Sequence, residues 1–228
     1  MTTKILKSIS IGLILMFQLA CNGKNVDNNL KVNSLDYKSE ENAVAKYELK
    51  IPQIEDEKSE DITYFNATMK EEMRYILENL STSENDGKIQ DAYVNFEEYK
   101  NNFGVLSVTV LSSVYTGGAH STNGFESYNI NLKDNSILTF DKLFTEEAKD
   151  YFNMKINDMI KNKDKVLNTN GDEVMFFDNC EANIANAVVY FEGDNVVFVF
   201  HEYDLSPYSS GMPVFKFDKK DVKKYLNI

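Results

Sequence analysis

The feature that most constrains the fold is a change of hydrophobic period along the chain. Apolar residues recur every three or four positions over residues 62–80 and 148–160, which is the spacing of one buried helix face. They alternate with polar residues over 106–114 and 128–132, which is typical of half-buried strands. Strands and helices come in mixed order without β-α-β alternation. The pattern therefore predicts an α+β fold, with antiparallel sheet packed against two main helices and a short C-terminal helix.

Shorter apolar runs predict the remaining elements. They are strands at 44–51 (ended by Pro52), 92–99, 188–191, 196–200 and 212–217, and a helix at 219–226. Along the strand at 106–114, Ser107, Thr109 and Ser113 fall between apolar residues. We therefore expect these three hydroxyls to face away from the core.

The first twenty residues have the pattern of an export signal. Lys4 and Lys7 precede a short apolar run at 9–17, which is about half of the ~20 residues that a membrane-spanning helix needs. Gln18, Leu19 and Ala20 then lead to Cys21. This resembles a bacterial lipoprotein signal, although Gln18 stands where a leucine is usual. An ordinary signal peptide with an incidental cysteine stays open as the alternative.

The lipoprotein interpretation predicts an extracytoplasmic protein anchored by lipid on Cys21. Residues 1–20 would be the signal peptide, and 21–42, rich in Asn, Lys, Asp and Ser, a flexible tether. The chain has 24 basic and 36 acidic residues, a net charge of −12, and removing 1–20 takes away two lysines to leave −14. Such a surface repels nucleic acid and anionic lipid and attracts cationic partners. We therefore expect no nucleic-acid partner, and contact with the membrane only through the N-terminal lipid.

Two segments carry candidate binding residues. Residues 115–120 read Tyr-Thr-Gly-Gly-Ala-His, in which the glycines allow close backbone approach. Residues 203–211 combine two tyrosines and a proline with small polar residues, a composition typical of protein-contact loops. The predicted partner-binding residues are Tyr115, Thr116, Gly117, Gly118, His120, Tyr203, Pro207, Tyr208 and Gly211. The alternative is that these tyrosines only cover the edge of the core.

An enzymatic site is the competing interpretation. The side chains of His120, His201, Glu202 and Asp204 are suitable metal ligands, but two distant loops would have to converge. The sequence has no Gly-x-Ser-x-Gly elbow and no phosphate-binding glycine loop. We therefore predict no catalytic residue, no metal ligand and no cofactor. A cell-wall-modifying enzyme with a histidine-containing metal site stays open.

Five segments occur in an order that resembles a known module. They are Ile51-Pro52-Gln53-Ile54, the helix from Ile62, Tyr115–His120, Leu138–Phe144, and Tyr203–Tyr208 with Gly211. The chain from about Ala43 onward is similar to the extracytoplasmic module shared by the anti-sigma factor RsiV and the accessory region of PdaC-like peptidoglycan deacetylases. The resemblance implies an α+β fold in two consecutive parts, 43–116 and 117–228. Because RsiV binds lysozyme through this module, it also implies a lysozyme-like partner.

The chain departs from these relatives in two respects. No sigma-binding segment or membrane span precedes the module, so we expect that it holds no sigma factor. Thr139-Phe140-Asp141 begins like a deacetylase string, but Lys142 stands where a second aspartate would be. The sequence therefore predicts a non-catalytic envelope binding module. A cell-wall glycan or another envelope protein as partner, and a structural lipoprotein that contacts peptidoglycan, stay open.

Overall fold

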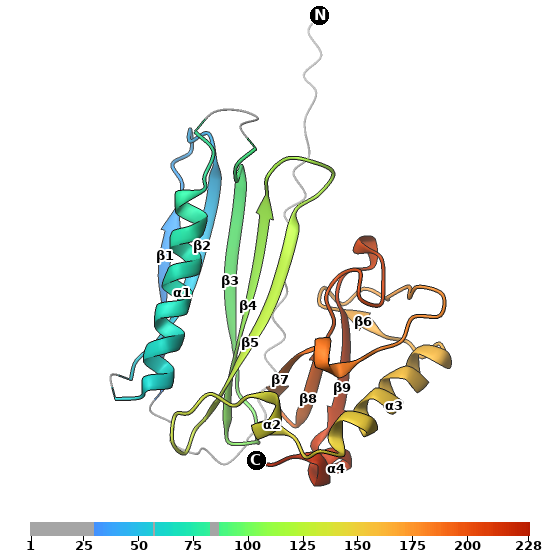
Figure 1. Cartoon of the computed structure of the whole chain (residues 1–228). Coiled ribbons are helices and arrows are strands. Elements are labelled where there is room, and N and C mark those ends of the chain that lie inside the picture. The colour runs from blue at the N-terminus through green and yellow to red at the C-terminus, as the bar shows by residue number, and fades with distance from the viewer. Residues whose placement is uncertain (1–29, 57, 83–86) are drawn as a thin grey trace, which may run out of the picture.

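Two β-sheets, each accompanied by one long helix, form two lobes that lie side by side (Figure 1). The computed structural model describes residues 30–56, 58–82 and 87–228. The predicted α+β class is confirmed. The predicted signal peptide and Cys21 lie outside the described residues. Within the described ranges, no helix has both the length and the apolar character needed to cross a membrane.

The first lobe is a five-stranded sheet in the order β1-β2-β3-β4-β5. Its elements are β1 (Val32–Lys38), β2 (Lys46–Ile54), α1 (Glu60–Glu78), β3 (Asp91–Tyr99), β4 (Val105–Tyr115) and β5 (Thr122–Asn131). Strands β2 and β3 are parallel and the other neighbours antiparallel, so the sheet is mixed rather than antiparallel throughout. The reason is that α1 joins β2 to β3, and a crossover helix returns the chain in the same direction.

Helix α1 confirms the predicted helical period at 62–80. It begins at Ser59, whose hydroxyl accepts a hydrogen bond from the Ile62 backbone amide. Its buried face consists of Ile62, Phe65, Met69 and Ile76, which belong to the core of the first lobe. This helix covers one face of the sheet (Figure 1).

Strand β1 lies inside the segment 21–42 that was predicted to be a tether. It pairs antiparallel with β2 from Val32 opposite Ile54 to Lys38 opposite Glu48. The polar composition of the segment concealed this edge strand, in which Leu35 packs against the core of the first lobe. Pro52 does not end β2 as predicted, because the pairing with β3 covers only Lys46–Leu49. Proline is tolerated where one side of a strand has no neighbour.

The second lobe is a four-stranded antiparallel sheet in the order β6-β9-β8-β7. Its elements are α2 (Phe140–Leu143), α3 (Ala148–Lys161), β6 (Leu167–Asn168), β7 (Val188–Glu192), β8 (Asn195–Val199), β9 (Pro213–Asp218) and α4 (Lys219–Val222). The predicted hairpin, last strand and short C-terminal helix are all present. Phenylalanines dominate the core, and the ring of Phe152 on α3 lies 4.6 Å from that of Phe198 on β8.

A buried polar network joins the two lobes. The Ser107 hydroxyl on β4 donates to Asn129 Oδ1 on β5 over 2.7 Å and accepts from the Phe191 amide on β7 over 3.0 Å. The Asn129 amide also donates to the Val189 carbonyl over 2.7 Å. Ser107 and Thr109, predicted to face away from the core, are 0% and 2% exposed. The prediction was wrong for both because β7 of the second lobe covers this face of the first sheet.

The predicted boundary between residues 116 and 117 falls within the hairpin that β4 and β5 form. These strands pair from Val114 opposite Thr122 to Val105 opposite Asn131, so the first sheet continues to Asn131. Gly117 and Gly118 have φ of +94° and +125°, which glycine adopts readily. They shape the turn of this hairpin.

Candidate functional site

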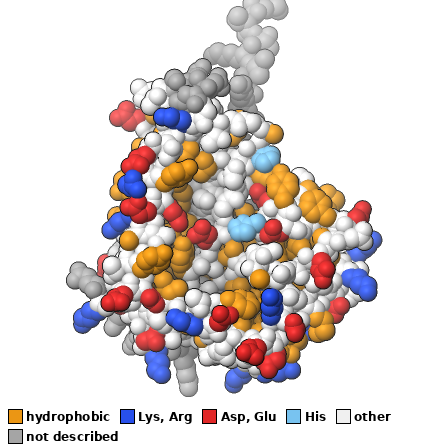
Figure 2. Space-filling view, viewed as in Figure 1, with side chains coloured by type: hydrophobic (Ala, Val, Ile, Leu, Met, Phe, Trp, Pro, Cys, Tyr) orange, Lys and Arg blue, Asp and Glu red, His pale blue; other side chains and the backbone are white. Residues whose placement is uncertain are grey.

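The two segments predicted to bind a partner meet in the structure. One is the turn between β4 and β5 in the first lobe, and the other is the loop between β8 and β9 in the second lobe. The Tyr203 hydroxyl lies 3.1 Å from His120 Nε2, although 83 positions separate these residues in sequence. Figure 2 shows both histidines of the chain on one face, with hydrophobic side chains beside them.

His120 makes two contacts to the second lobe and one within its own turn. Its ring stacks on Tyr208, with centroids 3.9 Å apart and an interplanar angle of 21°. Its Nδ1 lies 2.8 Å from the Ser121 carbonyl oxygen. Because a carbonyl can only accept, Nδ1 donates to the Ser121 oxygen, and in the neutral tautomer that this requires Nε2 accepts a hydrogen bond from the Tyr203 hydroxyl. We call His120, Tyr203 and Tyr208 the aromatic cluster.

Asn123 on β5 strengthens the connection beneath the aromatic cluster. Its side-chain amide donates to Glu202 Oε1 over 2.9 Å and to the Tyr208 hydroxyl over 3.3 Å. The sequence analysis did not select Asn123, and considered Glu202 only as a metal ligand. A single asparagine at the start of a strand carries no signal that separates it from an ordinary solvent-facing residue.

The remaining predicted residues shape the two loops. The Tyr115 hydroxyl donates to the Gly118 carbonyl over 3.1 Å and closes the turn that contains the exposed Thr116. Pro207 precedes the 3₁₀ turn at Tyr208–Ser210. The structure thus places every predicted partner residue in two adjoining loops.

Two backbone positions in the second loop are conformationally demanding. Tyr203 has φ of +71°, a left-handed conformation that costs a non-glycine residue about 1–2 kcal/mol, and its amide donates to the Ser206 carbonyl over 2.9 Å. Gly211 has φ of +67°, and a Cβ there would lie 2.9 Å from Asn168 Nδ2. Asn168 is buried and donates to the Ser210 carbonyl over 3.0 Å. Both positions fix the path of the loop that presents the tyrosines.

The residues considered for a metal site do not converge on one point. His201 and Asp204 belong to one tight turn, in which the His201 amide donates to Asp204 Oδ2 over 3.2 Å. His120 contacts the aromatic rings of Tyr203 and Tyr208 instead. Across the part of the chain that the structure describes, no group of three or more His, Cys, Asp or Glu side chains is arranged to hold a metal ion.

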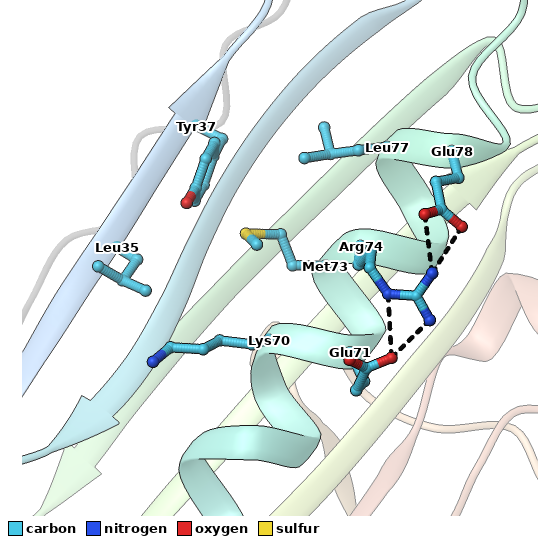
Figure 3. A pocket seen from close by; sticks show the side chains of 8 residues that line it. All are labelled: Leu35, Tyr37, Lys70, Glu71, Met73, Arg74, Leu77 and Glu78. Carbon is cyan, nitrogen blue, oxygen red and sulfur yellow. Dashed lines mark hydrogen bonds and ion pairs between the residues drawn. The ribbon is translucent and has the colours of Figure 1, made fainter.

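A shallow groove of about 390 Å³ lies between β1 and α1, away from the aromatic cluster (Figure 3). Leu35, Met73 and Leu77 supply its apolar lining. Arg74 donates to Glu71 on one side and to Glu78 on the other, as the dashed lines in Figure 3 show. The charge of Arg74 is therefore paired, and none of the predicted site residues lines the groove.

One carboxyl on α1 has a strongly raised pKa. Partial desolvation, followed by the negative charge of Glu126 on β5, raises the pKa of Glu72 to about 7. Glu126 also accepts a hydrogen bond from the Tyr128 hydroxyl over 2.9 Å, and burial raises the pKa of that phenol. This carboxyl pair lies in the first lobe and forms no part of the aromatic cluster.

Comparison with known proteins gives matches to two family models, one after the other along the chain. Residues 38–123 match the family model described as deacetylase PdaC, and residues 132–220 match the model described as a protein of unknown function, DUF3298. No curated protein matches the chain.

Two solved structures have a similar fold over most of their length. A DUF3298 family protein from Pseudomonas aeruginosa PAO1 is 12% identical, with a TM-score of 0.57 over 86% of this chain and 93% of its own. A DUF3298 family member from Bacteroides fragilis NCTC 9343 is 16% identical, with a TM-score of 0.54 over 87% and 94%. Identities this low establish a shared fold and nothing further. The chain therefore contains a region similar to the PdaC model followed by a region similar to the DUF3298 model, and it shares the fold of these two DUF3298 structures.

Proposed function

We propose that this protein is a non-catalytic binding module of the bacterial cell envelope, anchored by lipid on Cys21, and that its partner is a cationic protein of the lysozyme type. The observation that carries the proposal is the aromatic cluster of His120, Tyr203 and Tyr208, which two loops from different lobes build together. The resemblance to the RsiV module supplies the kind of partner.

The aromatic cluster suits recognition of a protein surface. Tyr203 is 58% exposed, and its ring is positioned by the left-handed backbone and by the hydrogen bond to His120. Tyrosine offers a large amphipathic contact area with few rotatable bonds. Because the loops are fixed by hydrogen bonds before a partner arrives, less conformational entropy is lost on binding.

The charge of the chain supports a basic partner. The net charge is −12, and −14 once residues 1–20 with their two lysines are removed. Complementary charge raises association rates and excludes partners of the same sign. Animal-type lysozymes are strongly basic, so the attraction would bring them toward this surface.

Calorimetric titration of hen-type lysozyme tests the proposal. The mature chain would carry Cys21→Ser, which removes the lipid site, and would be titrated at two salt concentrations. We expect saturable 1:1 binding that survives physiological salt. Tyr208→Ala should weaken it by about 2 kcal/mol, or roughly 30-fold, as expected for an interface hot spot.

The matched control is Tyr75→Ala on α1, because Tyr75 is 65% exposed and belongs to the helix rather than to either loop. This variant should bind as the unaltered protein does. Absence of binding would refute the lysozyme-type partner. Binding that disappears when salt is added would show that the acidic surface attracts lysozyme only as generic charge.

The anchor is tested separately in bacterial cells. The unaltered chain should fractionate with membranes, and Cys21→Ser should move it to the soluble extracytoplasmic fraction.

Pull-down on insoluble cell wall distinguishes a peptidoglycan-contacting lipoprotein from a protein receptor. Retention on cell wall that Tyr208→Ala does not change would favour the peptidoglycan alternative.

A further inference from the structure

We infer that the partner-binding surface extends beyond the aromatic cluster onto residues 173–178 of the second lobe, where Met175 and Phe177 contact a basic protein surface. This inference rests on the proposed function and adds residues that the predicted site did not contain. The segment follows β6 and runs without regular secondary structure.

The segment alternates between the core and the solvent. Val174 is 8% exposed, and Phe176 packs against the core, with its ring 6.2 Å from that of Phe215. Between and beyond them, Met175 is 70% exposed and Phe177 41% exposed. The inward side chains are enough to hold the segment in place, so the fold does not explain two large apolar side chains in water. Neighbouring exposed apolar residues of this kind mark interaction sites.

Hydrogen bonds hold this segment beside the loop that carries the tyrosines. The Phe177 amide donates to the Leu205 carbonyl over 2.9 Å, and the Met175 amide donates to the Ser210 hydroxyl over 3.4 Å. Residues 203–211 and 173–178 therefore run side by side. Tyr203, Met175 and Phe177 supply exposed apolar area from two adjacent stretches of chain.

Carboxylates flank these apolar side chains. Asp178 directly follows Phe177, Asp204 directly follows Tyr203, and both are exposed. Lys165 nearby forms an ion pair with Glu173 over 3.9 Å, so this positive charge is partly offset. Apolar side chains bordered by negative charge fit a folded protein surface rich in arginine and lysine, because guanidinium groups pack on aromatic rings while pairing with carboxylates. A neutral glycan would gain nothing from these charges.

The test is titration of hen-type lysozyme into the mature Cys21→Ser chain that also carries Met175→Ser and Phe177→Ser. Met175 is 70% and Phe177 41% exposed, so the melting temperature should fall only slightly, while the affinity should fall at least about tenfold. The control carries Met154→Ser and Tyr75→Ser, which are 52% and 65% exposed on α3 and α1, and should bind normally.

Asp178→Lys provides a second variant that removes no apolar contact. We expect slower association and several-fold weaker binding at low salt, with the difference shrinking as salt rises. Unchanged affinity in both variants, while Tyr208→Ala still weakens binding, would overturn this inference and leave the proposed function intact. Failure of the unaltered protein to bind lysozyme at all would overturn both.

Discussion

The imidazole of His120 lies nearly parallel to the ring of Tyr208 at a centroid distance of 3.9 Å, and this contact joins the two lobes. Aromatic pairs contribute about 0.5–1.5 kcal/mol beyond the area they bury. His120→Ala and Tyr208→Ala should therefore be non-additive in urea unfolding, with a coupling free energy of about 1 kcal/mol. Tyr75→Ala on α1 should add to His120→Ala without coupling. Strict additivity of the first pair would contradict a stabilising stack.

Because Ser107 belongs to the buried polar network between the lobes, we expect Ser107→Ala to lower the free energy of unfolding more than most serine substitutions do. Ser107→Ala removes the donor to Asn129 and leaves the buried Phe191 amide without its acceptor. A buried polar group left unsatisfied costs about 1–3 kcal/mol, so the free energy of unfolding should fall by that amount. Ser113→Ala on the same strand, where the residue is only half-buried, is the control and should cost less. Equal effects in urea unfolding would show that the network contributes little.

Comparing alanine substitutions at Gly211 and Gly104 distinguishes the stability cost of the backbone conformation from the cost of steric crowding. Both have positive φ, +67° and +74°, but a Cβ at Gly104 would meet nothing within 4 Å, whereas one at Gly211 would lie 2.9 Å from Asn168 Nδ2. Gly104→Ala should cost about 1–2 kcal/mol for the left-handed conformation alone. Gly211→Ala should cost more, because its ψ of −164° places it in a region nearly restricted to glycine and Asn168 must also move. Thermal unfolding of both variants tests this difference. An equal loss of stability in the two variants would contradict the added cost at Gly211.

The raised pKa of Glu72 predicts the direction in which folding stability changes with pH. Its pKa is raised from 4.5 to about 7 in the folded protein, so the native state binds more protons than the unfolded state in this window. Stability should therefore fall as the pH rises from about 4.5 to 7, and Glu72→Gln should remove that loss. At about pH 8 the variant should be more stable than the unaltered protein, and near pH 4 the two should match. The gain should be modest, because Glu72 is exposed and solvent screens its charge.

Glu71→Gln is the contrasting control for this pH effect. Hydrogen bonding to Arg74 lowers the pKa of Glu71, so its ionised form favours the folded state above the unfolded pKa. Stability from this group is present at neutral pH and is lost as the pH falls through the folded pKa. Glu71→Gln should thus be slightly destabilising at about pH 8. The same sign in both variants would show that general charge reduction, rather than these local environments, controls the response.

The pairing of β1 with β2 predicts how far the N-terminus can be shortened before the protein loses stability. Removing residues before Ala43 eliminates the whole β1–β2 ladder and uncovers the side of β2 that it protects. A chain starting at Leu30 should unfold at a clearly higher urea concentration than one starting at Ala43. The shorter chain should also associate more readily, because it presents unpaired backbone groups at the new sheet edge. Matching unfolding midpoints would show that β1 contributes little.

The hydrophobic period was sufficient to predict most elements, because helices and strands of each lobe bury one face. It failed where a second layer covers the other face. Ser107 and Thr109 carry the pattern of exposed strand residues, and their burial depends on β7, which lies far along the chain. Periodicity within one strand contains no information about which distant strand packs on its back.

The candidate site was predictable in composition but not in geometry. Glycine, tyrosine and proline identify the two loops from local sequence, since each has a conformational or contact preference of its own. The pairing of His120 with Tyr203 across 83 positions depends on how the two sheets dock. Asn123, which ties Glu202 and Tyr208 to the first lobe, could not be distinguished from an ordinary polar residue before its partners were known.

The hydrogen bond from Asn123 to Glu202 starts at the last residue of the PdaC-type match and ends within the DUF3298 match. A chain cut between the two matched regions would retain a turn without the opposing loop that supplies the carboxylate and the tyrosine rings. The two regions match separate family models, yet their side chains meet at this border. The aromatic cluster therefore needs both regions, because His120 follows the end of β4 while Tyr203 and Tyr208 lie in the loop after β8.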